Sequence, residues 1–517
     1  MNESEPNAEP RSRFGKTLFN VLFASFGYVA IRVVIAPVRI KLLTSLLTKE
    51  DYGLLTLVML TVSFITLISS LGSLEFMLRR VPGREEEFQF VTLRTIMTYF
   101  GLLAGAIGLL GAVGLAVWQP EKLGLAPAEV AACALILVLT VHLTQLVYFL
   151  MGRTAYAQSR MMLLLYADAW FLPLLAFMWV VDLTVGFMLW FWVVWLLLSV
   201  AVSQAFVRTR AILRRRPSRP LLKEIVLFGV PLMPMIMGEW IFQVQDRYVL
   251  LAFTDLEALA NFTLCFNIAW VGVTTGASML DVLVTEFYKT RNHVDTTNFA
   301  ELLAHAPLRY SFTLMLRYAL VLGLPIVLAL WFGGKPIILL LSSPQFADAA
   351  GIMKWVAPLP LLYLMGIIAG RTLMAVDRGP VVGAGTLAAA GVHLGLSIFL
   401  APLLAERGVA LAGCTAYGLL ALYLGVRVRF LAWIDWRELR PFRILLFAFV
   451  TAAALHLSIE WLPDHHFLSL AAAGLTSLAA LFAFGLIRKS DIQHFVDTMQ
   501  APAEPEEAAL QEPFARD

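Results

Sequence analysis

The sequence predicts an all-α, polytopic integral membrane protein with about 14 transmembrane helices, arranged as two pseudo-symmetric six-helix lobes plus an appended helix pair. Three observations predict it: an excess of apolar residues, apolar runs long enough to cross a bilayer, and basic residues in alternate loops. Of 517 residues, 60% are apolar and 15% are charged, whereas soluble proteins average roughly 45–50% and about 25%. One aqueous core cannot bury this excess, which excludes a soluble enzyme, a disulfide scaffold and a disordered chain.

The apolar runs predict the individual spans. A transmembrane helix needs about 20 predominantly apolar residues, and the runs lack the strict alternation of a membrane β-barrel. The sequence divides into spans at about 17–45, 53–78, 90–118, 128–151, 160–181, 185–207, 224–252, 259–286, 312–333, 350–374, 380–404, 409–430, 442–462 and 467–487.

Lysine and arginine in the short loops predict the orientation. Every second loop is basic, including the linker between residues 208 and 223, and the loops between them are nearly free of basic residues. Basic loops face the cytoplasm, so an even number of spans places both termini there.

Residues 38–55 and 246–263 indicate an internal duplication. Arg39 matches Arg247, and in both segments an aliphatic pair and a short polar turn with an acidic residue follow. Two halves that each start inside form a parallel repeat about an axis along the membrane normal. The predicted organisation is a cytoplasmic tail, an N-lobe of six helices, a basic linker, a C-lobe of six helices, a helix pair, and a partly disordered cytoplasmic tail, at 1–16, 17–207, 208–223, 224–430, 442–487 and 488–517.

Four segments resemble a known family. GVPLMPMIMGEWIFQVQDRYVLLAFTDLEALANFTLCFNIAW (229–270) is similar to the seventh and eighth helices of Wzx-type polysaccharide flippases of the multidrug/oligosaccharidyl-lipid/polysaccharide (MOP) exporter superfamily, through Pro231, Pro234, Trp240 and the Asp246-Arg247 pair. LLTSLLTKEDYGLLTLVML (42–60) with ISSLGSLEFMLRR (68–80), and LLLSSPQFADAAGIMKWVAPL (339–359), also resemble that family. The resemblance implies two lobes around a central cavity that opens to either face in turn, and a lipid-linked oligosaccharide as substrate. It also implies that the protein lies in the cytoplasmic (inner) membrane of a bacterium.

Ionisable residues at membrane depth are expensive and by default mark a pathway or a pair. Arg32 and Arg39 lie about two helical turns apart in the first span, as do Glu239 and Asp246 in the seventh, so each pair shares a helix face. Gln243 and Arg247 lie about one turn apart. Both polar stripes are expected to face the cleft between the lobes.

A diphosphate needs fixed positive charge, and a guanidinium matches phosphate oxygens with paired donors. Arg32, Arg247 and Arg317 are therefore the predicted substrate-binding cations, and Arg39, Gln243 and Trp240 complete the predicted set. Alternatives stay open: Arg247 pairs with Asp246 or Glu239, Arg39 and Arg371 snorkel to the interface, and Asp168 is an ion site or the partner of an arginine.

The remaining expectations concern energy and partners. Membrane potential alone is sufficient to drive an anionic lipid outward, and proton or sodium antiport through Asp168, Glu239 or Asp246 stays open. Pro231 and Pro234 are the predicted hinge.

No catalytic, metal or nucleotide motif is present, so no enzyme activity, cofactor or nucleic acid is expected. Expected partners are the glycolipid, membrane lipids and other polysaccharide assembly proteins.

Three other functions compete with the flippase. A cation-coupled multidrug exporter of the same superfamily is the first, and an acidic cavity would favour it. A polytopic glycan polymerase or ligase is the second, although the large external loop that such enzymes carry is absent from the predicted topology. A non-transporting scaffold is the third.

Overall fold

The computed structural model describes residues 31, 34–82, 84–118, 124–153, 155–177, 183–207, 209–292, 294, 299–376 and 378–486. Within these residues the chain is helical and contains no strand. Ten of the described helices are long and apolar enough to cross a membrane, and there are eleven if a bent pair counts as one span. The chain is thus a multi-pass membrane protein, and the total of about 14 spans stays a prediction.

The N-terminal bundle starts with residues 34–46, which are helical. Its further elements are α2 (Lys49–Ser70), α3 (Ser73–Arg80), α4 (Glu86–Trp118), α5 (Pro127–Gly152), α6 (Tyr156–Leu163), the π-helical turn η1 (Leu164–Asp168), α7 (Leu174–Phe177) and α8 (Val185–Ser203). The Thr48 side chain caps α2 by accepting from the Asp51 N–H at 3.1 Å. The long helix α5 packs against α2, α4 and α8 and forms the centre of this bundle.

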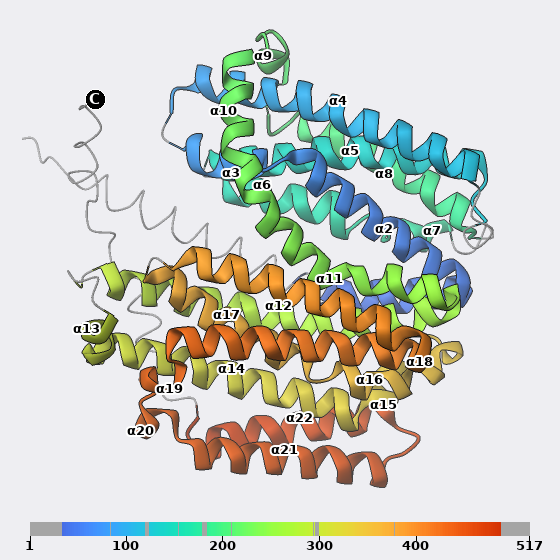
Figure 1. Ribbon diagram of the computed structural model, residues 1–517. Helices are drawn as coiled ribbons and strands as arrows, with labels where there is room; N and C mark the ends of the chain where they lie inside the picture. The colour runs from blue at the N-terminus through green and yellow to red at the C-terminus, as the bar shows by residue number, and fades with distance from the viewer. Residues whose placement is uncertain are drawn as a thin grey trace, which may run out of the picture.

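A linker joins the two bundles. It contains α9 (Thr209–Leu213), α10 (Arg219–Gly229) and the 3₁₀ turn η2 (Val230–Leu232). Helix α10 packs on α3 and α4 of the N-terminal bundle, whereas the next helix, α11 (Met233–Phe253), packs mainly on the C-terminal bundle. Figure 1 shows this green segment passing from the upper group of helices to the lower one.

The C-terminal bundle begins with α11. It continues with α12 (Leu256–Asn292), α13 (Phe299–Ala304), α14 (Ala306–Phe332), α15 (Gly334–Leu341), the 3₁₀ turn η3 (Pro344–Ala349), α16 (Ala350–Val356), α17 (Leu359–Ala375) and α18 (Gly379–Val428). Helix α18 breaks at Ala405, whose φ of 48° and ψ of −128° are not helical. The break separates the two spans predicted at 380–404 and 409–430.

The last helices form a separate pair. Short helices α19 (Phe430–Trp433) and α20 (Trp436–Leu439) lead to α21 (Pro441–Trp461) and α22 (His466–Ala483), which pack on each other and on α14 and α15. Figure 1 places them at the outer edge of the molecule, beyond α14. This position agrees with the appended helix pair predicted at 442–487, and the predicted repeat between the two lobes stays a prediction.

One predicted span differs from the structure. Within the span predicted at 160–181, α6 ends at Leu163, η1 follows, and a turn separates it from α7. Pro173 explains part of the break because proline cannot continue a helical hydrogen-bond ladder. The π-helical turn places Asp168 at its end, and such turns often occur at functional sites.

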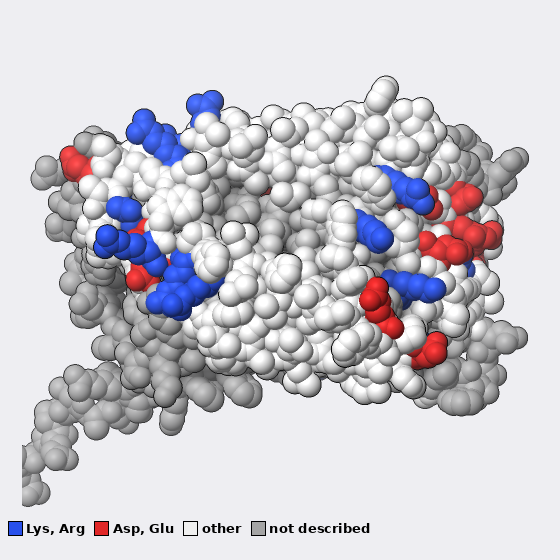
Figure 2. All heavy atoms as spheres, turned by 90° about the horizontal axis from the view of Figure 1, so that it is seen from below, with Lys and Arg blue, Asp and Glu red and all other residues white. Residues whose placement is uncertain are grey.

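The surface carries the charge pattern of a membrane protein. In Figure 2 the acidic and basic side chains gather at the two ends of the visible face, and its central zone is almost free of them. Exposed large apolar residues cover the outer helices, for example Phe442 and Phe449 on α21 and Phe467 on α22. A belt of this kind is what lipid tails require.

Candidate functional site

The two bundles are joined at one end by an exchange of hydrogen bonds, which we call the latch. Lys41 Nζ of the N-terminal bundle donates to the carbonyl oxygens of Leu339 (3.2 Å) and Ser342 (2.5 Å), near the end of α15. In return, Gln345 Nε2 donates to the carbonyl oxygens of Thr44 and Leu47, each at 2.9 Å. The last carbonyls of a helix have no partner within it, so each bundle caps a helix end of the other.

Contacts next to the latch extend this seal. The rings of Tyr52 and Phe346 lie edge to face, 5.5 Å apart. Lys49 Nζ lies 3.5 Å from a carboxylate oxygen of Asp348 and 3.8 Å from one of Glu257. Helices α2 and α12 approach so closely that a Cβ at Gly53 would lie 2.5 Å from the Leu256 carbonyl oxygen. These residues belong to the loops predicted to face away from the cytoplasm, so the seal closes the extracytoplasmic end under that orientation.

Removal of the latch cation is expected to open this end. Lys41→Met should raise the reactivity of a cysteine introduced at the buried Ala260, measured with a polar maleimide on protein in lipid nanodiscs. Hydrogen bonds to a charged group contribute about 1.5–3 kcal/mol, so even the lower end predicts about tenfold faster labelling. Lys335→Met, at an exposed position on α15, is the matched control. Equal rates in the wild type, Lys41→Met and the control would rule out the latch.

Arg39 and Asp168 form a pair in the N-terminal bundle. Arg39 Nη1 lies 3.9 Å from Asp168 Oδ1; the Arg39 side chain is 24% exposed and that of Asp168 is 5% exposed. The structure thus brings together two predicted site residues from different helices. It matches the alternative in which Asp168 is the partner of a bundle arginine.

Glu239 on α11 lies between the two bundles. Its side chain is exposed, and the charged groups that act on it are Arg371 of α17 and Glu75 of α3. The charges of Glu75 and of Arg160 on α6 also influence Tyr148 of α5 electrostatically. We use the name interlobe charge set for two groups of charges taken together: the Arg39–Asp168 pair, which lies within the N-terminal bundle, and the side chains of Glu75, Arg160, Glu239 and Arg371, which interact through their charges. It contains three cations and three anions.

Aromatic residues connect α11 to α2. The Trp240 ring stacks on Phe64, with ring centroids 3.5 Å apart. The hydroxyl groups of Tyr248 and Thr61 are hydrogen-bonded at 2.8 Å. The predicted substrate residue Trp240 is therefore half-buried against the N-terminal bundle, and Gln243, one turn further on, is also half-buried.

The seventh predicted span is bent. The segments Arg219–Leu232 and Ile236–Phe253 form an angle of 57°, and Pro231 and Pro234 lie at this break. Just before it, Gly229 packs so tightly on the turn between α2 and α3 that a Cβ there would overlap the Leu71 carbonyl oxygen. Gly72 in that turn has a φ of 72°, which favours glycine. The bend lies at the proline pair predicted to be the hinge.

Arg247 is enclosed in the C-terminal bundle. Its side chain is 1% exposed, and Nη1 donates to Asp246 Oδ1 at 2.8 Å and to the carbonyl oxygen of Gln243. The guanidinium lies over the Phe266 ring, 3.9 Å from its centroid. The pair matches the alternative in which Arg247 is neutralised by its neighbour. In this conformation its guanidinium does not reach a substrate, and its predicted substrate role stays a prediction.

Arg317 also has protein partners. It is 1% exposed, and its Nη1 donates to the carbonyl oxygen of Glu438 at 3.3 Å and lies 3.9 Å from Glu438 Oε2. One and two turns earlier on α14, Thr313 accepts from the Asp435 N–H and Arg309 donates to the Ile434 carbonyl. Through these contacts α14 fixes the segment that leads to α21. The predicted role of Arg317 in substrate binding is not tested by these contacts.

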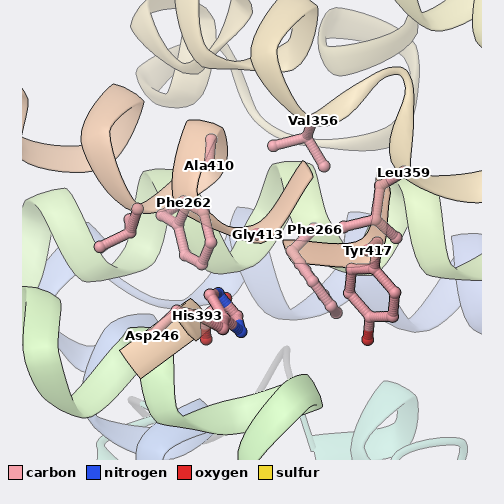
Figure 3. A pocket seen from close by; sticks show the side chains of 10 residues that line it. Asp246, Phe262, Phe266, Val356, Leu359, His393, Ala410, Gly413 and Tyr417 are labelled. Atoms are coloured by element: carbon pink, nitrogen blue, oxygen red, sulfur yellow. The ribbon is translucent and has the colours of Figure 1, made fainter. Parts of the chain in front are cut away.

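A small pocket lies beside the Asp246–Arg247 pair. Figure 3 shows Asp246 and His393 next to each other, with Tyr417, Phe262 and Phe266 around the same space. The pocket has no room for a water molecule. It lies inside the C-terminal bundle and is therefore distinct from the interlobe charge set.

Some predicted residues lie elsewhere, and some functional candidates were missed. Arg32 lies outside the described residues. Glu75 and Arg371 were not among the predicted site residues, because each stands near a predicted span end, where snorkelling is the ordinary interpretation. Lys41 and Gln345 were missed because both donate to main-chain carbonyls, which leave no side-chain signal. Within the described residues no group of three histidine, cysteine or acidic side chains could hold a metal ion.

Comparison with solved structures identifies the fold. The chain is similar to the lipid II flippase MurJ in an inward closed conformation, with a TM-score of 0.67 and 14% identity over 92% of this chain and 99% of that one. It is similar to inward-facing and outward-facing multidrug resistance transporters of the MATE family, MOP superfamily, with TM-scores of 0.56 and 0.53 and identities of 13% and 15%. These alignments cover 83% and 82% of this chain, and 96% and 95% of the transporters.

No protein-family model matches the sequence. No curated protein matches it either. The similarity is therefore carried by the fold, at sequence identities that leave the substrate open. The protein has the fold shared by transporters and flippases of the MOP superfamily, in agreement with the resemblance to Wzx-type flippases.

Proposed function

We propose that the protein moves a lipid-linked oligosaccharide, carried on a polyprenyl diphosphate, from the inner to the outer leaflet of the cytoplasmic membrane by alternating access. The glycan would serve surface or exopolysaccharide synthesis. The observation that carries the proposal is the interlobe charge set within an apolar bundle of this fold. Ionisable side chains are costly inside a bilayer, and a polar head group that crosses between two lobes needs such groups.

The extent of the fold supports a flippase over a drug exporter. The alignment with the lipid II flippase covers 92% of this chain, and the alignments with the two drug transporters cover 82% and 83%. The difference is close to the length of the α21–α22 pair, Pro441–Ala483. A helix pair beyond the two lobes offers additional apolar surface for a long lipid tail.

The charges of the set suit a phosphorylated glycan. Arg39, Arg160 and Arg371 provide guanidinium groups, which bind phosphate oxygens through paired donors. Glu75, Glu239 and Asp168 provide carboxylates, which accept hydrogen bonds from sugar hydroxyl groups. Arg32 is also proposed to belong to this site, because its position in the sequence places it on the same helix face as Arg39.

The latch and the bend at Pro231 and Pro234 are the two features that change during the proposed transport cycle. In this conformation the latch closes the extracytoplasmic end, so the substrate would enter from the cytoplasmic side. Opening to the outside requires the latch to break and α11 to move relative to α10 at Pro231 and Pro234. Both termini are proposed to lie in the cytoplasm, with membrane lipids and polysaccharide assembly proteins as partners.

The test is reconstituted flipping. A fluorescent undecaprenyl diphosphate oligosaccharide would be placed in proteoliposomes, and its arrival at the opposite leaflet measured by a membrane-impermeant quencher. Arg39→Glu should reduce the rate at least tenfold, because it replaces the cation of the Arg39–Asp168 pair by a repelling anion. Arg39→Lys should retain part of the rate, and Lys335→Gln all of it. Failure of the wild type to move the probe would reject the proposal.

The second candidate is a cation-coupled multidrug exporter. Glu239 favours it, because an exposed carboxylate on α11 attracts organic cations. The same proteoliposomes test it by uptake of ethidium. Ethidium transport that is lost in Glu239→Gln, together with no movement of the glycolipid, would establish this alternative.

A further inference from the structure

Several buried polar atoms in the C-terminal bundle have no hydrogen-bond partner among the described residues. Among them are both ring nitrogens of His393, the Tyr417 hydroxyl, Arg247 Nε and Gln245 Oε1. The four side chains come from α11 and α18, the two helices that hold this side of the bundle together. Buried polar groups are almost always hydrogen-bonded, so a cluster of exceptions calls for a functional explanation.

His393 is at the centre of this cluster. The residue is 1% exposed, and its ring lies 5.5 Å from that of Phe242. The Phe242 backbone lies within reach of the ring as a hydrogen-bond partner, although the contact falls outside ordinary hydrogen-bond geometry. On the other side, a Cβ at Gly413 would lie 3.3 Å from His393 Nε2, so the second half of α18 packs directly on the ring.

The groups that face His393 can be named element by element. From α11, Asp246 and Arg247 are the charged groups that act on it. The pocket walls supplied by α12, α16 and α17 are the apolar side chains of Phe262, Phe266, Val356 and Leu359. The second half of α18 adds the Tyr417 phenol and the small or apolar residues Val409, Ala410 and Gly413.

The charge state of His393 therefore matters to the Asp246–Arg247 pair. Arg247 and Asp246 neutralise each other at 2.8 Å, and a guanidinium stays protonated in proteins. A neutral His393 adds no charge to this pair. A protonated His393 adds one positive charge and two N–H donors beside Asp246. It then competes with Arg247 for the carboxylate.

We propose that His393 is a proton-binding site that couples proton movement to the position of α11. The inference rests on the proposed function and adds its energy source. In the conformation described here, His393 is neutral and Arg247 holds Asp246. When the packing of α11 on α18 loosens enough to admit water, His393 takes up one proton from it, and the resulting imidazolium attracts Asp246 and frees Arg247 from the carboxylate. Release of that proton to water on the other side restores the pair.

The small volume of the pocket limits which ligand it can hold. Because no water molecule fits beside Asp246 and His393, a hydrated metal ion does not fit there either. A proton needs no volume. The carboxylate that an incoming cation would use is already bound to the Arg247 guanidinium, which serves as a permanent counter-ion.

Helix α11 transmits the change to the rest of the molecule. On one face it meets His393 and Tyr417 through Phe242, and Gln245 Nε2 donates to Ser397 Oγ of α18 at 3.1 Å. On the other face it meets α2 through Trp240 and Tyr248. Its N-terminal end is the bend at Pro231 and Pro234. Loosening of α11 from α18 therefore acts on the contact between the two bundles.

The test measures conformation and needs no glycolipid. Spin labels on Glu50→Cys and Lys335→Cys, one exposed site in each bundle, report the distance across the sealed end in lipid nanodiscs. In the wild-type background this distance distribution should change between about pH 4.5 and 8.5, the range in which exposed and buried histidines titrate. The change should be lost in His393→Gln and in His393→Phe, which preserves the ring volume.

His142→Gln is the matched control, since His142 is a half-buried histidine inside α5 of the other bundle. It should retain the full change with pH. The same chain without the two introduced cysteines corrects for labelling of Cys133, Cys265 and Cys414. A wild type whose distances do not respond to pH, or a response that persists in both His393 variants, would overturn the proposal. A response to sodium at constant pH that both His393 variants retain would also overturn it.

These outcomes are separate from those of the flipping test. Loss of the pH response in the His393 variants supports the proton site even when the glycolipid probe is not moved. Conversely, glycolipid movement with no pH response rejects the proton site and leaves the flippase proposal intact.

Discussion

Asp246→Asn is expected to destabilise the protein by about 3–5 kcal/mol, because it leaves the Arg247 charge buried without its partner. Arg247 is 1% exposed and cannot lose its proton. Arg247→Met should cost less, since an isolated Asp246 can become neutral by binding a proton. The double variant Asp246→Asn/Arg247→Met should recover most of the loss. The measurement is the midpoint temperature at which the detergent-solubilised protein ceases to be monodisperse.

The asymmetry between the two single variants is the informative result. A packing role alone predicts that the larger side chain, arginine, is the more costly one to replace. Lys335→Met, at an exposed site, provides the reference for a lost surface charge. Equal midpoints for the wild type and Asp246→Asn would show that the guanidinium has another counter-ion.

Gly229→Ala is expected to abolish transport with little effect on membrane insertion. A Cβ at this position would overlap the Leu71 carbonyl oxygen and lie 3.1 Å from Gly72 Cα. The obstacle is backbone, which cannot turn aside as a side chain can, so α10 must move away from the turn between α2 and α3. Flipping by the proteoliposomes should fall at least tenfold. Insertion is followed by the amount of monodisperse protein recovered from membranes.

Gly366→Ala is the control for this prediction, because a Cβ at that glycine of α17 would meet no atom within 4 Å. It should retain flipping. Full activity of Gly229→Ala would mean that the close contact between α10 and the α2–α3 turn is not required in the transport cycle.

Sequence reasoning was most successful where the apolar pattern carries the information. The fold class, the bend at Pro231 and Pro234, the separation of α18 into two parts and the terminal helix pair all follow from apolar run length and from proline. It did not predict the π-helical turn that interrupts the span at 160–181. Such a turn depends on tertiary contacts, for example Trp195 Nε1, which donates to the Leu165 carbonyl oxygen at 2.8 Å.

The site was harder to predict than the fold. Sequence spacing places Arg39, Glu239 and Arg247 on helix faces, but it does not say which partners lie opposite them. Asp168 is near Arg39 only because η1 turns it inward, and Glu438 reaches Arg317 only because the segment before α21 folds back on α14. Pairing across distant segments depends on packing, which single-sequence patterns do not contain.

The latch requires few specific side chains. Its acceptors are the carbonyl oxygens of Leu339, Ser342, Thr44 and Leu47, which every amino acid provides, and its main donors are only two side chains, Lys41 and Gln345. Mutational drift at Leu339, Ser342 and Leu47 can therefore leave the closed state intact as long as the helix ends stay in place, whereas the Thr44 hydroxyl also accepts from the Ser343 N–H at 3.2 Å. One amine and one amide at corresponding positions identify this contact in distant homologues, even where the surrounding residues have diverged.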